Sequence, residues 1–142
     1  MNNMNIEPIF GLVTDDQIRE IEERLSFTIP EKYFQFLSKY NGGIPEFSSF
    51  IITGENDQSQ VLVFYGIKKG ATYDLLNASR SWKKYLPTAF LPIASDAGGN
   101  QIVLDCNPEN AGAIYFMDHE AHPGKNLTKI ADSFTAFVES LH

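Results

Sequence analysis

The densest group of side chains with metal-binding chemistry lies in residues 118–122, which read DHEAH. Carboxylate oxygens and imidazole nitrogens are common metal ligands, and four of these five residues carry them: Asp118, His119, Glu120 and His122. If the segment continues the strand predicted before it, neighbouring side chains point to opposite faces, so Asp118 and Glu120 could converge without His119. The helical HExxH pattern is absent. The alternative, which we favour, is a strand end whose side chains bond nearby backbone or face solvent, with no bound metal.

Cys106 is the only cysteine of the 142-residue chain, so it cannot form an internal disulfide. Together with His119 it could in principle supply a thiol nucleophile and its base. A lone cysteine behaves as a small hydrophobic residue unless a nearby cation lowers its pKa, and no basic residue stands beside Cys106 in the sequence. We therefore predict a buried structural thiol and expect no enzyme activity.

The stretch DAGGNQIVLD, residues 96–105, contains a glycine pair that has two interpretations. A phosphate-binding loop would deliver backbone N–H groups at the start of a helix, usually with a lysine, and neither feature follows here. Both flanking segments are instead typical of strands. Gly98, Gly99 and Asn100 tolerate the positive φ angles of tight turns, so we predict a hairpin turn.

Four segments have the apolar spacing and end signals of helices. Thr14 and Gln17 form a capping box at the start of the first. Pro30 suits the first turn of the second helix. This helix is predicted to end at Asn41, Gly42 and Gly43. The predicted helices cover residues 14–25, 30–40, 71–87 and 127–141.

Five segments rich in β-branched and aromatic residues predict strands, and short polar or glycine-containing turns separate most of them. They cover residues 47–54, 60–67, 90–95, 100–106 and 113–118, with a loop at residues 55–59. Short connections favour antiparallel neighbours, since parallel strands need long crossovers. We predict a single α+β domain over residues 1–142. Its sheet is twisted, mostly antiparallel, of about five to six strands, and flanked by N-terminal, middle and C-terminal helices.

The chain is acidic, with 18 Asp and Glu residues against 11 Lys and Arg residues and a formal net charge of -7. This charge opposes non-specific binding to nucleic acid or anionic lipid and favours a basic partner. Residues 61–90 reverse the balance, with five basic residues and one acidic, which we interpret as a solvated helix end. Residues 1–13 contain neither a basic leader nor an apolar run long enough for a membrane span, so we expect a cytoplasmic protein.

Four segments in the same order resemble the SUKH superfamily, also called the Smi/Knr domain, with a core of about residues 14–141. They are IPEKYFQFLSKYNGGIPEF (29–47), LPIASDAGGNQIVLD (91–105), AIYFMDHE (113–120) and LTKIADSFTAFVESL (127–141). The resemblance implies a binding module. Bacterial members of the superfamily are typically immunity proteins that bind and neutralise a toxin, often a nuclease, whereas fungal relatives regulate cell-wall synthesis.

We accordingly predict a non-catalytic immunity protein whose partner is a basic cognate toxin, with no cofactor. Polar and aromatic residues near strand ends and turns are the predicted contacts: Glu46, Trp82, Asp96, Asn100, Asp105, Asp118 and Glu120. Phe47 and Phe50 are further aromatic candidates, but we expect both in the core. The alternatives are a regulatory scaffold of the Smi/Knr type and a small metal-dependent hydrolase centred on residues 118–120.

Overall fold

A six-stranded antiparallel sheet in the order β3-β4-β5-β6-β7-β8 forms the centre of the fold. The computed structural model describes residues 4–54, 56–110 and 112–142. The strands are β3 (Ser49–Thr53), β4 (Asp57–Phe64), β5 (Phe90–Asp96), β6 (Gln101–Asp105), β7 (Ile114–Met117) and β8 (Leu127–Ala131). Each strand pairs with the next strand in sequence, and α3 lies in the connection between β4 and β5, so the predicted α+β class and antiparallel sheet are confirmed.

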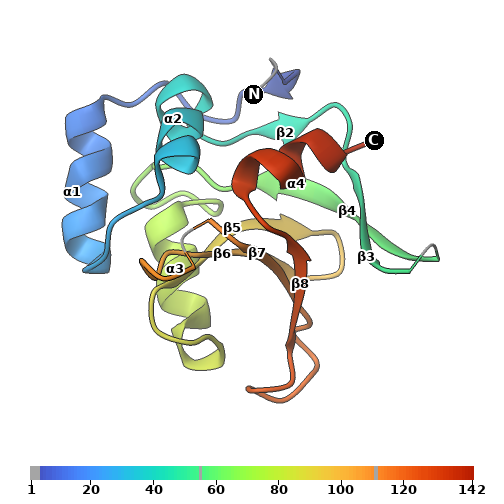
Figure 1. Cartoon of the computed structure of the whole chain (residues 1–142). Coiled ribbons are helices and arrows are strands. Elements are labelled where there is room, and N and C mark those ends of the chain that lie inside the picture. The colour runs from blue at the N-terminus through green and yellow to red at the C-terminus, as the bar shows by residue number, and fades with distance from the viewer. Residues whose placement is uncertain (1–3, 55, 111) are drawn as a thin grey trace.

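The sheet is strongly curled. Its first strand, β3, contacts its last strand, β8. Figure 1 shows β8 and the β3–β4 hairpin on the same side of the molecule. The right-handed twist that strands share accumulates across six of them, which brings the two edges toward each other. The curl encloses the inner face of the sheet.

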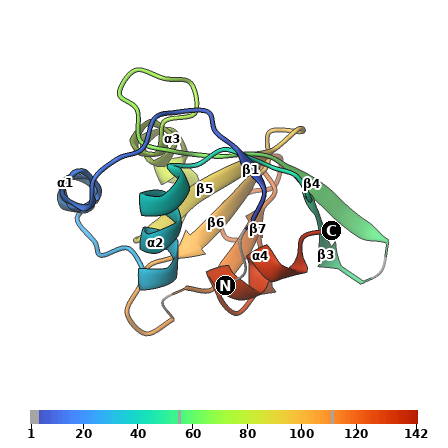
Figure 2. The same cartoon turned by 90° about the horizontal axis from the view of Figure 1, so that it is seen from above.

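Helices cover the sheet on both sides. In Figure 1, α2 and α4 lie above β5, β6 and β7, whereas α3 lies below them, and Figure 2 shows α2 and α4 nearer the viewer from above. The bounds are α1 (Asp15–Leu25), α2 (Glu31–Tyr40), α3 (Leu75–Trp82), the 3-10 turn η1 (Lys83–Tyr85) and α4 (Phe134–Ser140). Every residue of β6 and all of β5 except Phe90 are buried, as expected for strands covered on both faces.

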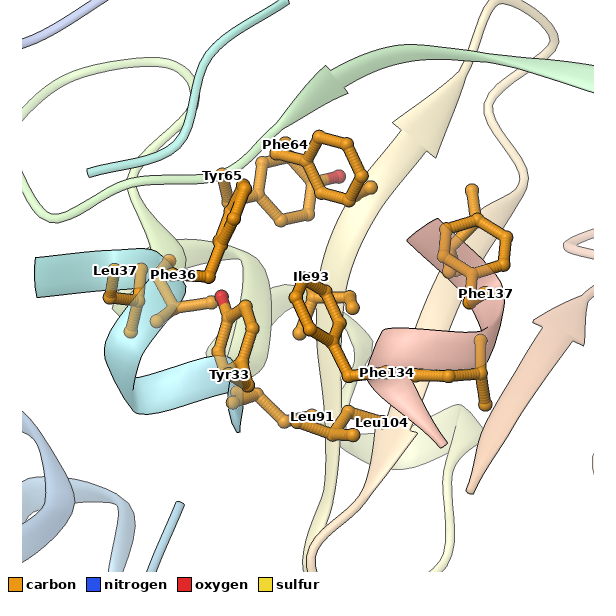
Figure 3. Close-up of a cluster of buried hydrophobic side chains, with 14 of the residues drawn as sticks. Tyr33, Phe36, Leu37, Phe64, Tyr65, Leu91, Ile93, Leu104, Phe134 and Phe137 are labelled. Carbon is orange, nitrogen blue, oxygen red and sulfur yellow. The ribbon is translucent and has the colours of Figure 1, made fainter. Parts of the chain in front are cut away.

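An aromatic cluster joins α2, α4 and the sheet (Figure 3). The ring centroids of Phe36 and Phe134 are 5.1 Å apart, those of Phe36 and Phe64 are 5.0 Å apart, and those of Tyr33 and Phe134 are 5.2 Å apart. All four side chains are almost completely buried. Tilted and edge-to-face pairs at this spacing add to the stability that burial alone gives.

The Asn-Gly-Gly segment after α2 ties the helix to a distant loop. Asn41 adopts a left-handed conformation with φ 52°, which ends the helix as the sequence predicts. Its buried side chain donates to the carbonyls of Gly11 and Ile67 and accepts from the N–H of Ile67 at 2.7 Å. A Cβ on Gly42 would come within 2.6 Å of two backbone oxygens, so only glycine fits there.

The prediction of one helix over residues 127–141 is wrong in its first third, since β8 occupies Leu127–Ala131 and α4 begins only at Phe134. Leu127 and Ile130 have helical spacing, but pairing with β7 satisfies the backbone of this segment at the sheet edge. The side chain of Ser133 accepts from the N–H of Ala136 and marks the true helix start.

Two further elements have different bounds from those predicted, and one small ribbon was not predicted. The helix predicted over residues 71–87 is the shorter α3, with Asp74 as its N-cap, followed by η1. β4 begins at Asp57, inside the predicted loop, because the hairpin extends beyond the rest of the sheet. A two-stranded ribbon of β1 (Ile6–Glu7) and β2 (Ile44–Pro45) was not predicted, as two-residue strands carry no periodic signal.

Among the described residues, no helix has the length and apolar character needed to cross a membrane.

Candidate partner-binding surface

The turn between β5 and β6 is organised by the carboxylate of Asp96, which is only 5% exposed. Its Oδ1 accepts from the N–H groups of Gly98 and Asn100 at 2.9 and 2.8 Å. Its Oδ2 accepts from Asn100 Nδ2 at 3.0 Å and from Ser59 Oγ at 2.9 Å. Gly99 supplies the positive φ of 88°. The predicted hairpin turn is confirmed, and these two N–H groups face a carboxylate of the same chain, not an outside anion.

Asn100 links this turn to the segment that follows β7. Its Oδ1 accepts from the backbone N–H of His119 at 3.1 Å and lies 2.7 Å from Nδ1 of the same imidazole. The imidazole ring lies against Gly99, where an added Cβ would be 3.6 Å from it. We use the name turn cluster for the residues brought together here: Asp96, Asn100, Asp118, His119 and Glu120.

Asp118 and Glu120 are the exposed acidic members of the turn cluster. β7 ends at Met117, so residues 118–120 do not continue the strand, in agreement with the strand end that we favour from the sequence. Asp118 instead begins a turn in which its Oδ1 accepts from the N–H of Glu120 at 3.0 Å. In residues 4–54, 56–110 and 112–142, no three His, Cys, Asp or Glu side chains are grouped to hold a metal ion.

Asp105 and Cys106 lie at the other end of β6 from the turn cluster. The Asp105 carboxylate is 2% exposed and accepts from the backbone and side-chain N–H groups of Asn107, each at 2.9 Å. Burial, and then the charges of Asp105 and Glu22, raise the pKa of the Cys106 thiol far above its usual range. The thiol is buried as predicted, and β6 separates it from His119, so the two do not form a catalytic pair.

Trp82 lies outside the turn cluster, at the end of α3. Its half-buried ring packs edge-to-face on Tyr85, with centroids 5.6 Å apart. The carbonyl of Tyr85 accepts from Asn126 Nδ2 at 2.9 Å, which connects η1 to the loop before β8. Trp82 is therefore partly available at the surface but belongs to a different region from Asp118.

Glu46 and Phe47 line a separate hollow of about 430 Å³, which we call the terminal groove. Its lining comprises Met4, Asn5, Pro45, Glu46, Phe47, Val138, Glu139 and Leu141. Phe50 is buried as expected, but Phe47 is 62% exposed, so its assignment to the core is wrong. Phe47 lies in the bend between β2 and β3, outside both strands. Nothing in the sequence places Glu139 near Glu46, since only the folded structure brings α4 close to β2.

A second hollow, of about 470 Å³, lies between α1 and α3 and has the opposite charge. Its basic residues are Arg24, Lys68, Lys69 and Arg80. Arg24 is paired with Glu20 at 3.3 Å, and the buried Asp74 carboxylate accepts from the N–H of Lys68. Three of the five basic residues of segment 61–90, Lys68, Lys69 and Arg80, thus line one hollow, on elements that do not line the terminal groove.

Comparison with known proteins gives two matches. The model of the SMI1 / KNR4 family (SUKH-1) matches residues 12–140. The SPbeta prophage-derived uncharacterized protein YokK of Bacillus subtilis (strain 168) is 34% identical over 146 residues, a match that covers 90% of this chain and 74% of that protein.

Proposed function

Since this chain belongs to the SMI1 / KNR4 family (SUKH-1), we propose that it is an immunity protein that neutralises a cognate bacterial toxin by direct binding, without catalysis. The observation that carries the proposal is the family match over residues 12–140, because toxin immunity is a frequent role in this family. The similarity to a prophage-derived protein is compatible with such a role.

The charge of the molecule supports a basic partner. A net charge of -7 repels nucleic acid but attracts a protein whose own site binds nucleic acid, as in a nuclease toxin. Complementary charge accelerates encounter and discriminates against wrong partners. A protein that covers a basic active site needs little more than an acidic, rigid surface.

The state of the candidate catalytic groups supports a role without chemistry. The Cys106 thiol is buried and its pKa is raised, which keeps it protonated and poorly nucleophilic. The Asp96 carboxylate accepts hydrogen bonds from its own turn and from Ser59, and Nδ1 of His119 lies 2.7 Å from Oδ1 of Asn100. Asp96 is therefore used in building the turn.

The predicted contact residues differ in how exposed their side chains are, and this separates direct from indirect roles. We propose that Glu46, Asp118 and Glu120, which are exposed, and the half-buried Trp82 are available to contact the toxin. The buried or partly buried residues of the set are Asp96, Asn100 and Asp105. Asp96 and Asn100 act indirectly, because their hydrogen bonds fix the turn beside Asp118 and Glu120, whereas Asp105 fixes a turn at the other end of β6.

The proposal is tested by identifying a toxin gene beside the gene for this chain and producing that toxin. We expect that co-expression of this chain restores growth to a bacterial host that produces the toxin. We also expect the two purified proteins to form a stable complex on size-exclusion chromatography. Failure of the purified chain both to bind and to protect would contradict the proposal.

Two other results would favour the alternatives. Stoichiometric zinc or manganese in protein purified without a histidine tag would point to a metal-dependent hydrolase at residues 118–120. Capture of several host proteins, with no binding to the neighbouring toxin, would point to a regulatory scaffold.

A further inference from the structure

One wall of the terminal groove is the β1–β2 ribbon, which lies close to α4 in Figure 1. Ile6 pairs with Pro45, and the backbone N–H of Glu46 donates to the carbonyl of Asn5 at 2.9 Å. The Asn5 side chain also donates to the Glu46 carboxylate. Close packing continues at Gly43, where a Cβ would come within 2.4 Å of the Ile6 side chain. The ribbon is thus held in one position, with Glu46 fixed at its end.

The opposite wall is α4 and the chain that leaves it. Val138 is buried and Leu141 is half-buried, while Glu139 is exposed on the same helix. The backbone of His142 exchanges two hydrogen bonds with Ser49 of β3, at 3.1 and 3.0 Å. Both walls are therefore tied to the sheet, and a groove that is formed before binding loses less conformational entropy when a partner enters.

The surface of the groove combines an exposed aromatic ring with carboxylates. Phe47 is 62% exposed, and Ile44, on the adjoining side of the ribbon, is 40% exposed. A neighbouring hollow of about 450 Å³ shares the ribbon and adds Glu7 to the carboxylates of Glu46 and Glu139. Among the residues that the structure describes, no Lys, Arg or His lines either hollow. Exposed apolar area rimmed by polar residues is a feature of binding surfaces, and the carboxylates favour a positively charged partner.

We propose that the terminal groove is the docking site for an arginine-containing segment of the toxin. The guanidinium pairs with Glu46 and Glu139 while an apolar neighbour covers Phe47, and arginine can also interact favourably with the phenylalanine ring. The proposal rests on the proposed immunity function and names the surface that performs it.

A second copy of this chain fits the groove poorly. A two-fold interface centred on the groove would place the two grooves against each other and bring Glu46 and Glu139 close to the same carboxylates of the second copy. Like charges in contact destabilise such a pair, whereas a basic segment relieves their mutual repulsion.

The experiment measures binding of four variants to the neighbouring toxin by isothermal titration calorimetry. Phe47→Ala and Glu139→Lys alter the groove. Leu12→Ala removes another exposed apolar side chain, at 73% exposure, and Glu23→Lys makes the same change of net charge on exposed residues of α1. We expect each groove variant to weaken binding by about tenfold or more and each control by less than about threefold. Thermal unfolding checks that all four variants fold like the wild type.

The outcomes separate the two proposals. If the wild type binds the toxin and the groove variants bind it as tightly as their matched controls, the groove proposal is contradicted and the immunity proposal is not. Absence of wild-type binding and protection would contradict the immunity function and the groove with it. A wild-type dimer in sedimentation that Phe47→Ala dissociates would also overturn the proposal, since a second copy would then occupy the groove.

Discussion

At the residue scale, the buried carboxylate of Asp96 positions exposed residues of the turn cluster although it is not itself exposed. Asp96 satisfies two backbone N–H groups, an amide and a hydroxyl, so it fixes both the β5–β6 turn and the position of β4 beside it. Through Asn100 the same network orients His119 and the exposed Asp118 and Glu120. The sequence identified these residue types, but it suggested a direct contact role where the geometry supports a positioning role.

We expect Asp96→Asn to lower the free energy of unfolding by about 2–4 kcal/mol, because an amide nitrogen would face donors that now meet a carboxylate oxygen. The measurement is equilibrium unfolding in urea. Asp118→Asn is the control at an exposed position of the same cluster and should change stability by less than about 1 kcal/mol. Equal effects of the two substitutions would show that the buried network contributes nothing beyond an exposed carboxylate.

The buried thiol and phenols predict alkaline sensitivity. Burial raises the pKa of Cys106 and of Tyr33, so the folded chain keeps protons that the unfolded chain releases. The unfolded state then binds fewer protons, and stability falls as pH rises above the ordinary thiol range, near about pH 8.5, while it is unaffected by these groups below it.

We therefore expect the urea midpoint to decrease from about pH 8.5 to about pH 10.5, and Cys106→Ala to make this decrease smaller. The comparison concerns the pH dependence, since loss of the sulfur lowers stability somewhat at every pH. An identical pH profile for the variant would argue against thiolate formation as a cause.

At the scale of elements, tertiary pairing decides where strands end and helices begin. Thr128 and Ile130 are β-branched, and their segment completes the sheet beside β7, although its apolar spacing also suits a helix. The sequence predicts the capping box at Thr14 because its two residues lie three positions apart. The sequence does not predict β8, because its strand conformation depends on pairing with β7.

Ser133→Ala tests the observed start of α4. The Ser133 hydroxyl oxygen accepts from the N–H of Ala136 at 3.0 Å, so its loss should lower the free energy of unfolding by about 1 kcal/mol. Ser140→Ala, at the other end of the helix, should cost less than about 0.5 kcal/mol. If the helix instead began at residue 127, neither serine would be a cap and the two variants would behave alike.

At the scale of the whole molecule, charge is unevenly distributed. Lys68, Lys69 and Arg80 of segment 61–90 line the hollow between α1 and α3, while the terminal groove and the exposed part of the turn cluster carry carboxylates. Such an arrangement orients the molecule as it approaches a basic partner, so that the acidic surfaces meet the partner first.

We predict that association with the toxin slows about tenfold or more as ionic strength rises from about 0.05 M to about 0.5 M, because the screening length shortens several-fold. The dissociation rate should change much less. Stopped-flow fluorescence measures both rates, and Glu23→Lys and Glu139→Lys report whether total charge or its location matters. An association rate independent of salt would exclude electrostatic steering.

The sequence by itself determined the α+β class, the start of α1 at its capping box, the β5–β6 turn and the buried state of Cys106. Each depends on interactions within a few residues or on the bulk preference of a side chain for the interior. Acidity and the resemblance of four ordered segments also pointed to a binding protein of the family that the comparison identifies.

Only the tertiary structure decided which polar residues face solvent and which distant residues share a surface. Asp96 and Asp105 lie inside and Phe47 lies outside because burial depends on neighbours from other strands. Glu46 and Glu139 come to one groove because the curled sheet brings α4 beside a two-residue ribbon. Long-range packing of this kind leaves no local pattern, since its energy arises only when segments far apart in the chain meet.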